Sequence, residues 1–274
     1  MKLSYQMATP ELTRSPAVTA YMKDMERGLK LLHECGYKGV ELMIRDCKGQ
    51  NKAAFDRMIR ENDLGVSLLC TGEIWAQEHI SLSDIDDDKR KRCMEKFREM
   101  IDFAAPYGAQ VNIGRVRGSI VPGVDPRVTM DRAVAAFREL AVYAAERGVT
   151  LCLEPVNRLQ CNFINSTREG REVVDMVGHP NFRIMLDLFH MNIEDRDLCE
   201  EILASRGYFT YVHICDNNRL YPGNCGFDFA AILHALRQTG YDGWLSAEVF
   251  QIPDDDVCVR KTAEHILPLL GKEG

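Results

Sequence analysis

The run Leu151-Cys152-Leu153-Glu154 decides the fold, together with three later runs of the same kind. Each is a short apolar stretch that ends in a residue able to bind a metal, and the other three are Ile184-Met185-Leu186-Asp187, Tyr211-Val212-His213 and Leu245-Ser246-Ala247-Glu248. A buried strand gains nothing from a charge at its last position unless something compensates that charge. Two glutamates, one aspartate and one histidine provide the oxygen and imidazole ligands that suit Mn²⁺, Mg²⁺, Zn²⁺ or Co²⁺. These four residues are therefore the candidate metal ligands.

Short apolar runs alternate with longer amphipathic ones along the whole chain. The predicted strands are Lys2–Met7, Gly39–Ile44, Gly65–Thr71, Gln110–Arg115, Thr150–Pro155, Phe182–Phe189, Phe209–Cys215 and Trp244–Phe250. The predicted helices are Ala17–Cys35, Lys52–Asn62, Lys89–Tyr107, Asp131–Arg147, Thr167–Val177, Leu198–Ser205, Asp228–Thr239 and Val257–Leu270. Several of them stop at a glycine that suits the left-handed C-cap, namely Gly36, Gly108, Gly148, Gly178, Gly207 and Gly240.

Eight strand–helix units in succession imply parallel strands joined by right-handed crossovers. Eight such units close a barrel, so the predicted fold is a single (β/α)₈ TIM barrel that spans residues 1–274. A doubly wound open sheet is the alternative, but no Gly-x-Gly-x-x-Gly motif follows any predicted strand to support a dinucleotide site. Neither a glycine- and serine-rich linker nor a shift in composition marks a domain boundary.

The composition argues against nucleic-acid-binding, secreted and membrane proteins. The formal net charge of −7 argues against a nucleic-acid surface, which needs a basic face. The ten cysteines form no Cys-x-x-Cys pair, and several lie within apolar patterns, as expected of reduced thiols in a cytoplasmic protein. No apolar run at the N-terminus is long enough for a signal peptide, and none elsewhere approaches a membrane span, so no membrane partner is expected.

The four candidate ligands would meet at one point in such a barrel. They end strands five to eight and are 33, 26 and 35 residues apart, or about one strand–helix unit each. Active sites of (β/α)₈ barrels lie at this C-terminal face. Loop residues that follow these strands are candidate substrate contacts: His190, Arg219 and Arg158. Arg115 and Arg117, after strand four, could meet an acidic or phosphorylated substrate, with a surface ion pair as the alternative.

At this point the sequence resembles a known family, the xylose-isomerase-like barrels, and within it the ketose 3-epimerases. The resemblance is clearest over Leu153-Glu154-Pro155-Val156-Asn157-Arg158, over Met185 to Glu194, over the loop His213 to Gly223, and at Ala247-Glu248. It implies one divalent metal, usually manganese, with zinc, magnesium or cobalt as alternatives. It implies that Glu154, Asp187, His213 and Glu248 hold the metal, and that Glu154 and Glu248 are also the acid/base pair. His190 and Arg219 would position the substrate oxygens, and a homodimer or homotetramer is expected.

Two departures from that pattern concern the substrate pocket rather than the metal site. The epimerases carry a second glutamate six residues after the first, where this chain has Gln160. Their Pro-Gly-x-Gly loop here is Pro222-Gly223-Asn224-Cys225. An uncharged amide at position 160 would suit a substrate that carries a carboxylate, because it avoids repulsion between like charges.

The chemistry expected of such a site is proton abstraction beside a carbonyl. A divalent cation stabilises the resulting enolate, and a carboxylate takes the proton. If carboxylates lie on both faces of the enolate, one can remove the proton and the other can return it, which inverts the stereocentre. If the proton returns to the adjacent carbon instead, an aldose and a ketose are interconverted. The primary hypothesis is a metal-dependent epimerase or isomerase of a sugar, sugar acid or sugar phosphate. One alternative is a lyase or dehydratase, which would expel a β-hydroxyl from the same enolate. A second is an endonuclease IV-like nuclease, which needs more histidine ligands. A third is a non-catalytic sugar-binding barrel.

Overall fold

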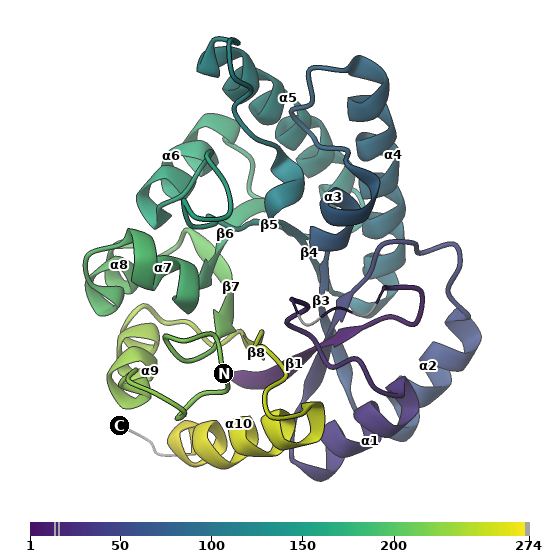
Figure 1. Ribbon diagram of the computed structural model, residues 1–274, viewed down its shortest axis with the longest axis vertical. Helices are drawn as coiled ribbons and strands as arrows, with labels where there is room; N and C mark the ends of the chain where they lie inside the picture. The colour runs from purple at the N-terminus through teal and green to yellow at the C-terminus, as the bar shows by residue number, and fades with distance from the viewer. Residues whose placement is uncertain (14, 16, 272–274) are drawn as a thin grey trace.

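Eight parallel strands close into a barrel around the centre of the molecule, with helices outside it (Figure 1). The computed structural model describes residues 1–13, 15 and 17–271. The strand order is β1-β2-β3-β4-β5-β6-β7-β8, and β8 pairs with β1 to complete the ring. The sequence-based prediction of a (β/α)₈ barrel is confirmed.

The strands lie within the predicted runs but are shorter at their C-terminal ends, apart from the first, which is one residue longer. They are β1 (Lys2–Ala8), β2 (Gly39–Met43), β3 (Gly65–Cys70), β4 (Gln110–Ile113), β5 (Leu151–Leu153), β6 (Phe182–Asp187), β7 (Phe209–Ile214) and β8 (Trp244–Ala247). The residues that follow the strands leave the ladder because they turn into the loops that form the mouth of the barrel. Glu154 and Glu248 therefore lie one residue beyond β5 and β8, where their side chains are free of the sheet.

The helices cover the outside of the barrel. They are α1 (Met25–Glu34), α2 (Lys52–Glu61), α3 (Gly72–Glu78), α4 (Asp87–Ala104), α5 (Pro126–Ala145), α6 (Thr167–Val177), α7 (Leu188–Glu194), α8 (Leu198–Ala204), α9 (Phe229–Gln238) and α10 (Asp255–Leu270), with the short 3₁₀ turns η1 (Ala105–Tyr107) and η2 (Arg115–Arg117). All six glycines predicted to end helices have positive φ angles, between 62° and 86°.

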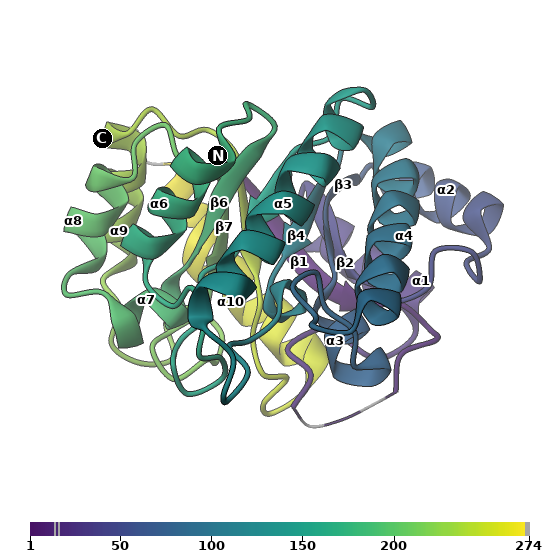
Figure 2. The same cartoon turned by 90° about the horizontal axis from the view of Figure 1, so that it is seen from above.

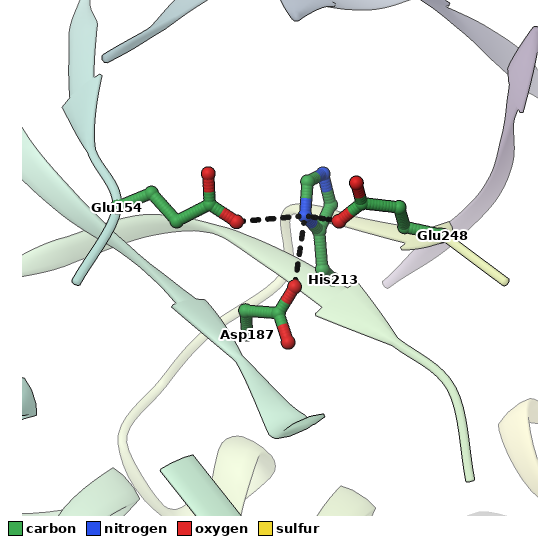
Figure 3. A group of neighbouring side chains, drawn as sticks. All are labelled: Glu154, Asp187, His213 and Glu248. Carbon is green, nitrogen blue, oxygen red and sulfur yellow. Dashed lines mark hydrogen bonds and ion pairs between the residues drawn. The ribbon is translucent and has the colours of Figure 1, made fainter. Parts of the chain in front are cut away.

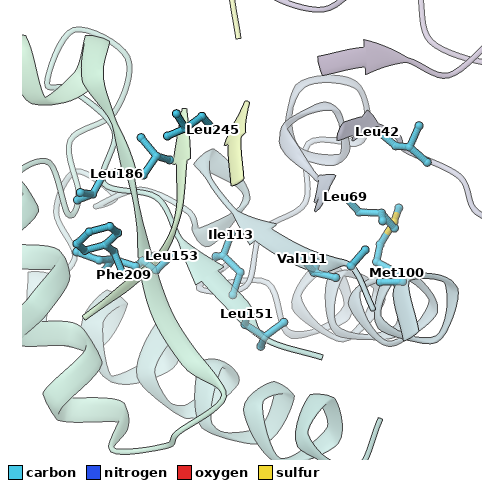
Figure 4. Packing of buried hydrophobic residues seen from close by; sticks show 14 of the residues in the cluster. Leu42, Leu69, Met100, Val111, Ile113, Leu151, Leu153, Leu186, Phe209 and Leu245 are labelled. Atoms are coloured by element: carbon cyan, nitrogen blue, oxygen red, sulfur yellow. The ribbon is translucent and has the colours of Figure 1, made fainter. Parts of the chain in front are cut away.

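Two apolar layers result from the alternation of side chains along each strand. Leu151 and Leu153 of β5 face the surrounding helices and belong to the large cluster between strands and helices, part of which is drawn in Figure 4. Cys152, between them, belongs to a smaller cluster inside the barrel, together with Met185 and Tyr211. The barrel interior is thus a packed core, and the open space lies at its C-terminal mouth.

The structure differs from several of the predicted helices. For example, α5 begins at Pro126 rather than at Asp131. Residues 17–24 do not extend α1, because residues around Tyr21 pair with β1 through Ala8 N to Tyr21 O and Tyr21 N to Gln6 O, both at 2.9 Å. Asp24 then caps the helix by accepting from Arg27 N at 2.8 Å. The short helices α3 and α7 were not predicted, since each has only seven residues and follows its strand almost directly.

All ten cysteines are free thiols. Within residues 1–13, 15 and 17–271, none of the helices combines the length and apolar character that a membrane span requires.

Candidate active site

The four predicted metal ligands converge at the C-terminal mouth of the barrel. One ligand atom from each of Glu154, Asp187, His213 and Glu248 lies within 4.8 Å of the ligand atoms of the other three. His213 Nδ1 is the centre of the group: it lies 2.8 Å from Glu248 Oε2, 3.3 Å from Asp187 Oδ2 and 3.5 Å from Glu154 Oε1. Figure 3 shows the two glutamates approaching from opposite sides of the histidine ring.

Asp187 is oriented by the helix that it begins. Its Oδ1 accepts from Phe189 N at 2.9 Å and from His190 N at 3.1 Å, so this oxygen caps α7. Its Oδ2 is left to face His213. Burial would raise the pKa of Asp187, but the nearby Arg219 guanidinium holds that pKa well below its usual value. The carboxylate is therefore charged and ready to bind a cation.

Each glutamate has a fixed orientation as well. Asn112 Nδ2 donates to Glu154 Oε2 at 2.9 Å, and Thr19 Oγ1 donates to Glu248 Oε1 at 2.9 Å. Gly114 also limits the space beside Glu154, because a Cβ at position 114 would lie 2.8 Å from Glu154 Oε2. Burial would raise the pKa of Glu248, but Arg219 and His213 lower it to about 2.

Glu41 is the charged residue that sequence reasoning missed. It lies in the middle of β2, fully buried, and both of its carboxylate oxygens are 3.0 Å from His213 Nε2. Gln6 Nε2 donates to Oε1 at 2.8 Å and Tyr211 OH donates to Oε2 at 2.9 Å. The sequence did contain an indication of this residue's role, because a glutamate interrupts the apolar run Gly39-Val40-Glu41-Leu42-Met43.

Glu41 sets the role of each His213 nitrogen. Burial would lower the pKa of His213, but Glu41 and Glu248 raise it well above its usual value. With the Nε2 proton held by Glu41, Nδ1 is the nitrogen that faces the three carboxylates and can bind a metal.

Arg219 lies on the opposite side of the acidic group. Its Nη1 donates to both oxygens of Asp187, at 2.7 and 2.8 Å, and its Nη2 donates to Glu248 Oε2 at 2.5 Å. Its backbone has a φ of 63°, in the left-handed region, and the loop that carries it is held by Asp216. Asp216 accepts from five backbone amides of that loop: Asn217, Gly223, Cys225, Gly226 and Phe227.

His190 also lies where the sequence predicted it. Its Nε2 is 3.8 Å from Glu154 Oε1, and Asn157 Nδ2 lies 2.7 Å from its Nδ1. Burial lowers the pKa of His190, so the ring is neutral. An amide nitrogen only donates, which makes Nδ1 the acceptor and puts the proton of the neutral ring on Nε2, facing the cavity.

A cavity of about 280 Å³ opens beside these groups, near the lower end of the range for small-molecule sites. Glu154, His190, Arg219 and Glu248 line it, together with Gln160, Arg115, Glu73 and the apolar Val18, Met43, Phe189 and Phe250. Gln160 is therefore placed where a substrate contact is possible.

Two predicted substrate contacts lie elsewhere. Arg158 has an exposed side chain that pairs with Glu194 through Nη2 to Oε2 at 2.6 Å, and it is not among the residues that line the cavity. Arg117 is fully buried, so the expectation that it meets an acidic substrate is wrong, as is the alternative of a surface ion pair. Its guanidinium donates to backbone carbonyls of Gly114, Glu154, Phe163 and Ile164 at 2.6 to 3.1 Å.

Replacing Arg117 by Met should therefore lower stability rather than alter substrate binding. The carbonyls that it satisfies would be buried without donors, and each such group costs about 1–3 kcal/mol. We expect the free energy of unfolding to fall by about 3 kcal/mol or more, as measured by urea denaturation. Arg127→Gln is the control, since its side chain is 88% exposed. A change of less than about 0.5 kcal/mol in the Arg117 variant would contradict this role.

Residues 29–267 match the model of the family described as xylose isomerase-like TIM barrel. The chain belongs to this family.

Among its members with a stated activity, the L-ribulose 3-epimerase of Mesorhizobium japonicum is 30% identical over 90% of this chain and 83% of that protein. The L-ribulose 3-epimerase of Methylomonas sp. is 40% identical over 129 residues. That match covers 47% of this chain and 45%, or about half, of the length of that relative. A crystal structure of D-allulose 3-epimerase from Methylomonas sp. in complex with D-allulose superposes with a TM-score of 0.82, at 25% identity, over 98% of this chain and 96% of that one. The TM-score shows that this crystal structure shares the arrangement of strands and helices described above.

Proposed function

We propose that this protein is a divalent-metal-dependent sugar epimerase of the ketose 3-epimerase type, folded as one barrel over residues 1–274. The observation that carries the proposal is the placement of two buried glutamates on opposite sides of His213, within one cavity of sugar size (Figure 3). An epimerase needs a base on one face of a carbon and an acid on the other. Relatives named as ketose epimerases support the same reaction class.

The residues present fit a divalent metal. Three carboxylates and a histidine nitrogen share one small volume. Burial would lower the pKa of His213, but Glu41 and Glu248, with smaller effects of Asp187 and Glu154, raise it well above its usual value. A dication can take the place of that proton. Glu154, Asp187, His213 and Glu248 would hold the ion, for which Mn²⁺ is our first choice, with Zn²⁺, Mg²⁺ or Co²⁺ as alternatives. When bound, the ion would act as a Lewis acid that stabilises the enolate.

The remaining steps belong to the protein's own side chains. One of Glu154 and Glu248, as the carboxylate, removes the proton from the carbon next to the substrate carbonyl. The other, as the carboxylic acid, donates its own proton to the opposite face, which inverts the stereocentre and leaves the first glutamate protonated. His190 Nε2–H donates to a substrate oxygen near Glu154. Arg219, whose guanidinium carbon lies 4.9 Å from the centre of the Phe189 ring, stabilises the negative charge of Glu248.

Proton exchange in D₂O tests this proposal. The Mn²⁺-loaded protein is incubated with ketoses, ketose phosphates and ketonic acids and followed by NMR and mass spectrometry, with an EDTA-treated sample as the control. We expect deuterium at the carbon beside the carbonyl, together with an epimer of unchanged carbon skeleton, and neither in the control. Loss of one water from the product would indicate the lyase instead. An absence of exchange with every substrate, despite one bound ion per chain, would contradict the epimerase. Sedimentation of the same sample tests the expected homodimer or homotetramer.

A further inference from the structure

Arg115 is a cation that lines the active-site cavity. It is the first residue of η2 and lines the same cavity as Glu154 and Glu248. Within residues 1–13, 15 and 17–271, its guanidinium forms neither an ion pair nor a hydrogen bond, whereas Arg219, in the same cavity, is paired with two carboxylates. A guanidinium has five donors, and leaving them unpaired beside a binding site is typical of a group that binds a ligand.

The position of the Arg115 side chain is nevertheless defined. Its guanidinium carbon lies 4.8 Å from the centre of the Trp75 ring, a cation–π contact that holds the charge against α3. Helix α3 lies at the end of the barrel opposite the N-terminus, the end at which the site lies (Figure 2). Arg115 is therefore an ordered charge at the active-site mouth rather than a freely moving surface side chain.

The turn that carries Arg115 is tied to the metal-binding end of the site. Arg117 Nη1 donates to Gly114 O at 2.9 Å and to Glu154 O at 3.1 Å, so one buried arginine joins the backbone of η2 to that of Glu154. The backbone next to Arg115 and the backbone of Glu154 are thus held together by the fold. Two anchors at a fixed separation select substrates by length as well as by charge.

Among the described residues, the acids that line the cavity contact groups other than Arg115. Glu248 pairs with Arg219, and Glu154 accepts from Asn112 Nδ2. Glu73 is the other acid that lines the cavity, but its carboxylate accepts from Gln77 Nε2 at 2.5 Å instead of pairing with Arg115. Gln160 adds an uncharged amide to the same wall, which can donate to an anion without repelling it.

We propose that the substrate of this enzyme carries an anionic group, a carboxylate or a phosphate, at the end remote from the reacting carbon, and that Arg115 binds it with the help of Gln160. This assignment of substrate class rests on the proposed epimerase function. In such a complex the guanidinium forms charge-assisted hydrogen bonds to two oxygens of the anion. The carbonyl end of the substrate lies at Glu154 and Glu248.

Turnover of a matched set of ketoses tests this assignment. The set is D-fructose, D-fructuronate and D-fructose 6-phosphate, which differ at C6 as an alcohol, a carboxylate and a phosphate. We expect kcat/KM to be higher for one of the anions than for fructose, and the better anion identifies the group. In Arg115→Gln, KM for that anion should rise by about 10- to 100-fold with little change in kcat. The values for fructose should change much less than those for the anion. Arg127→Gln is the control for the loss of one positive charge.

A binding measurement that needs no turnover separates this proposal from the proposed reaction. D-glucitol and D-glucitol 6-phosphate lack a carbonyl and cannot be epimerised, so calorimetry on the Mn²⁺-loaded protein reports recognition alone. Tighter binding of the phosphate that disappears in Arg115→Gln would support the anion site even if no ketose exchanges. A preference that survives in Arg115→Gln would show that the phosphate binds elsewhere, for example at the metal. If fructose turns over as well as both anions and glucitol binds as tightly as its phosphate, the proposal is wrong while the epimerase stands.

Discussion

Glu248→Gln should lower kcat for epimerisation by about 10²- to 10⁴-fold, the usual contribution of a general acid or base. The amide keeps the size of the side chain and one oxygen that faces Thr19 Oγ1, but it cannot take or return a proton. It also removes the charge that pairs with Arg219 Nη2. The rate is measured by NMR at saturating metal, so that weaker metal binding does not limit it.

The metal content of Glu248→Gln decides how its loss of rate is interpreted. Glu248 has two proposed roles, as an acid/base group and as a ligand, and inductively coupled plasma analysis separates them. We expect a bound ion at saturating Mn²⁺, together with the low rate. Glu73→Gln is the matched control, since Glu73 lines the cavity but lies outside the group of four ligands. A Glu248→Gln enzyme with the wild-type rate would remove Glu248 from the acid/base pair.

Glu41→Gln should weaken Mn²⁺ binding by about 10- to 100-fold, although Glu41 lies outside the group of metal ligands. Its carboxylate holds the Nε2 side of His213 and so presents Nδ1 to the other three residues. The amide has the same shape and can still accept from Nε2–H, so the change removes the negative charge without leaving a cavity. Calorimetric titration of the metal-free protein with Mn²⁺ measures the effect.

Tyr211→Phe is the control for Glu41→Gln. It removes the hydrogen bond from Tyr211 OH to Glu41 Oε2 but leaves the contact between Glu41 and His213 in place. We expect it to change the metal affinity much less than Glu41→Gln does. Equal affinities for wild type and Glu41→Gln, accompanied by a lower melting temperature, would show that Glu41 has only a packing role.

Most of the barrel could be predicted from the sequence because local patterns of residues encode its strands and helices. Buried parallel strands are short continuous apolar runs, and their helices carry an apolar stripe and end at glycines. The errors occur where another interaction competes with the local pattern. The segment before α1 has helical periodicity, yet residues 17–24 follow β1 because the backbone of Tyr21 pairs with that strand and Asp24 caps the helix.

The four candidate ligands could be predicted for a topological reason. Parallel strands of a closed barrel all end at the same face, so a ligand at the end of each of four consecutive strands must approach the others. Glu41 could not be placed in the same way, since it lies within a strand rather than at its end. It reaches His213 across the barrel interior, and a contact between residues 172 positions apart is not encoded locally.

Two arginines show most clearly what could not be predicted from the sequence alone. Arg115 and Arg117 are two residues apart and follow the same strand, so their sequence contexts are almost identical. In the folded protein Arg117 is fully buried among backbone carbonyls, whereas Arg115 lies over Trp75 beside the cavity. The sequence by itself determined the barrel and the group of four candidate ligands, because both follow from strand order. Only the tertiary structure decided which charged side chains are buried, paired or free, because those states depend on neighbours that other segments of the chain provide.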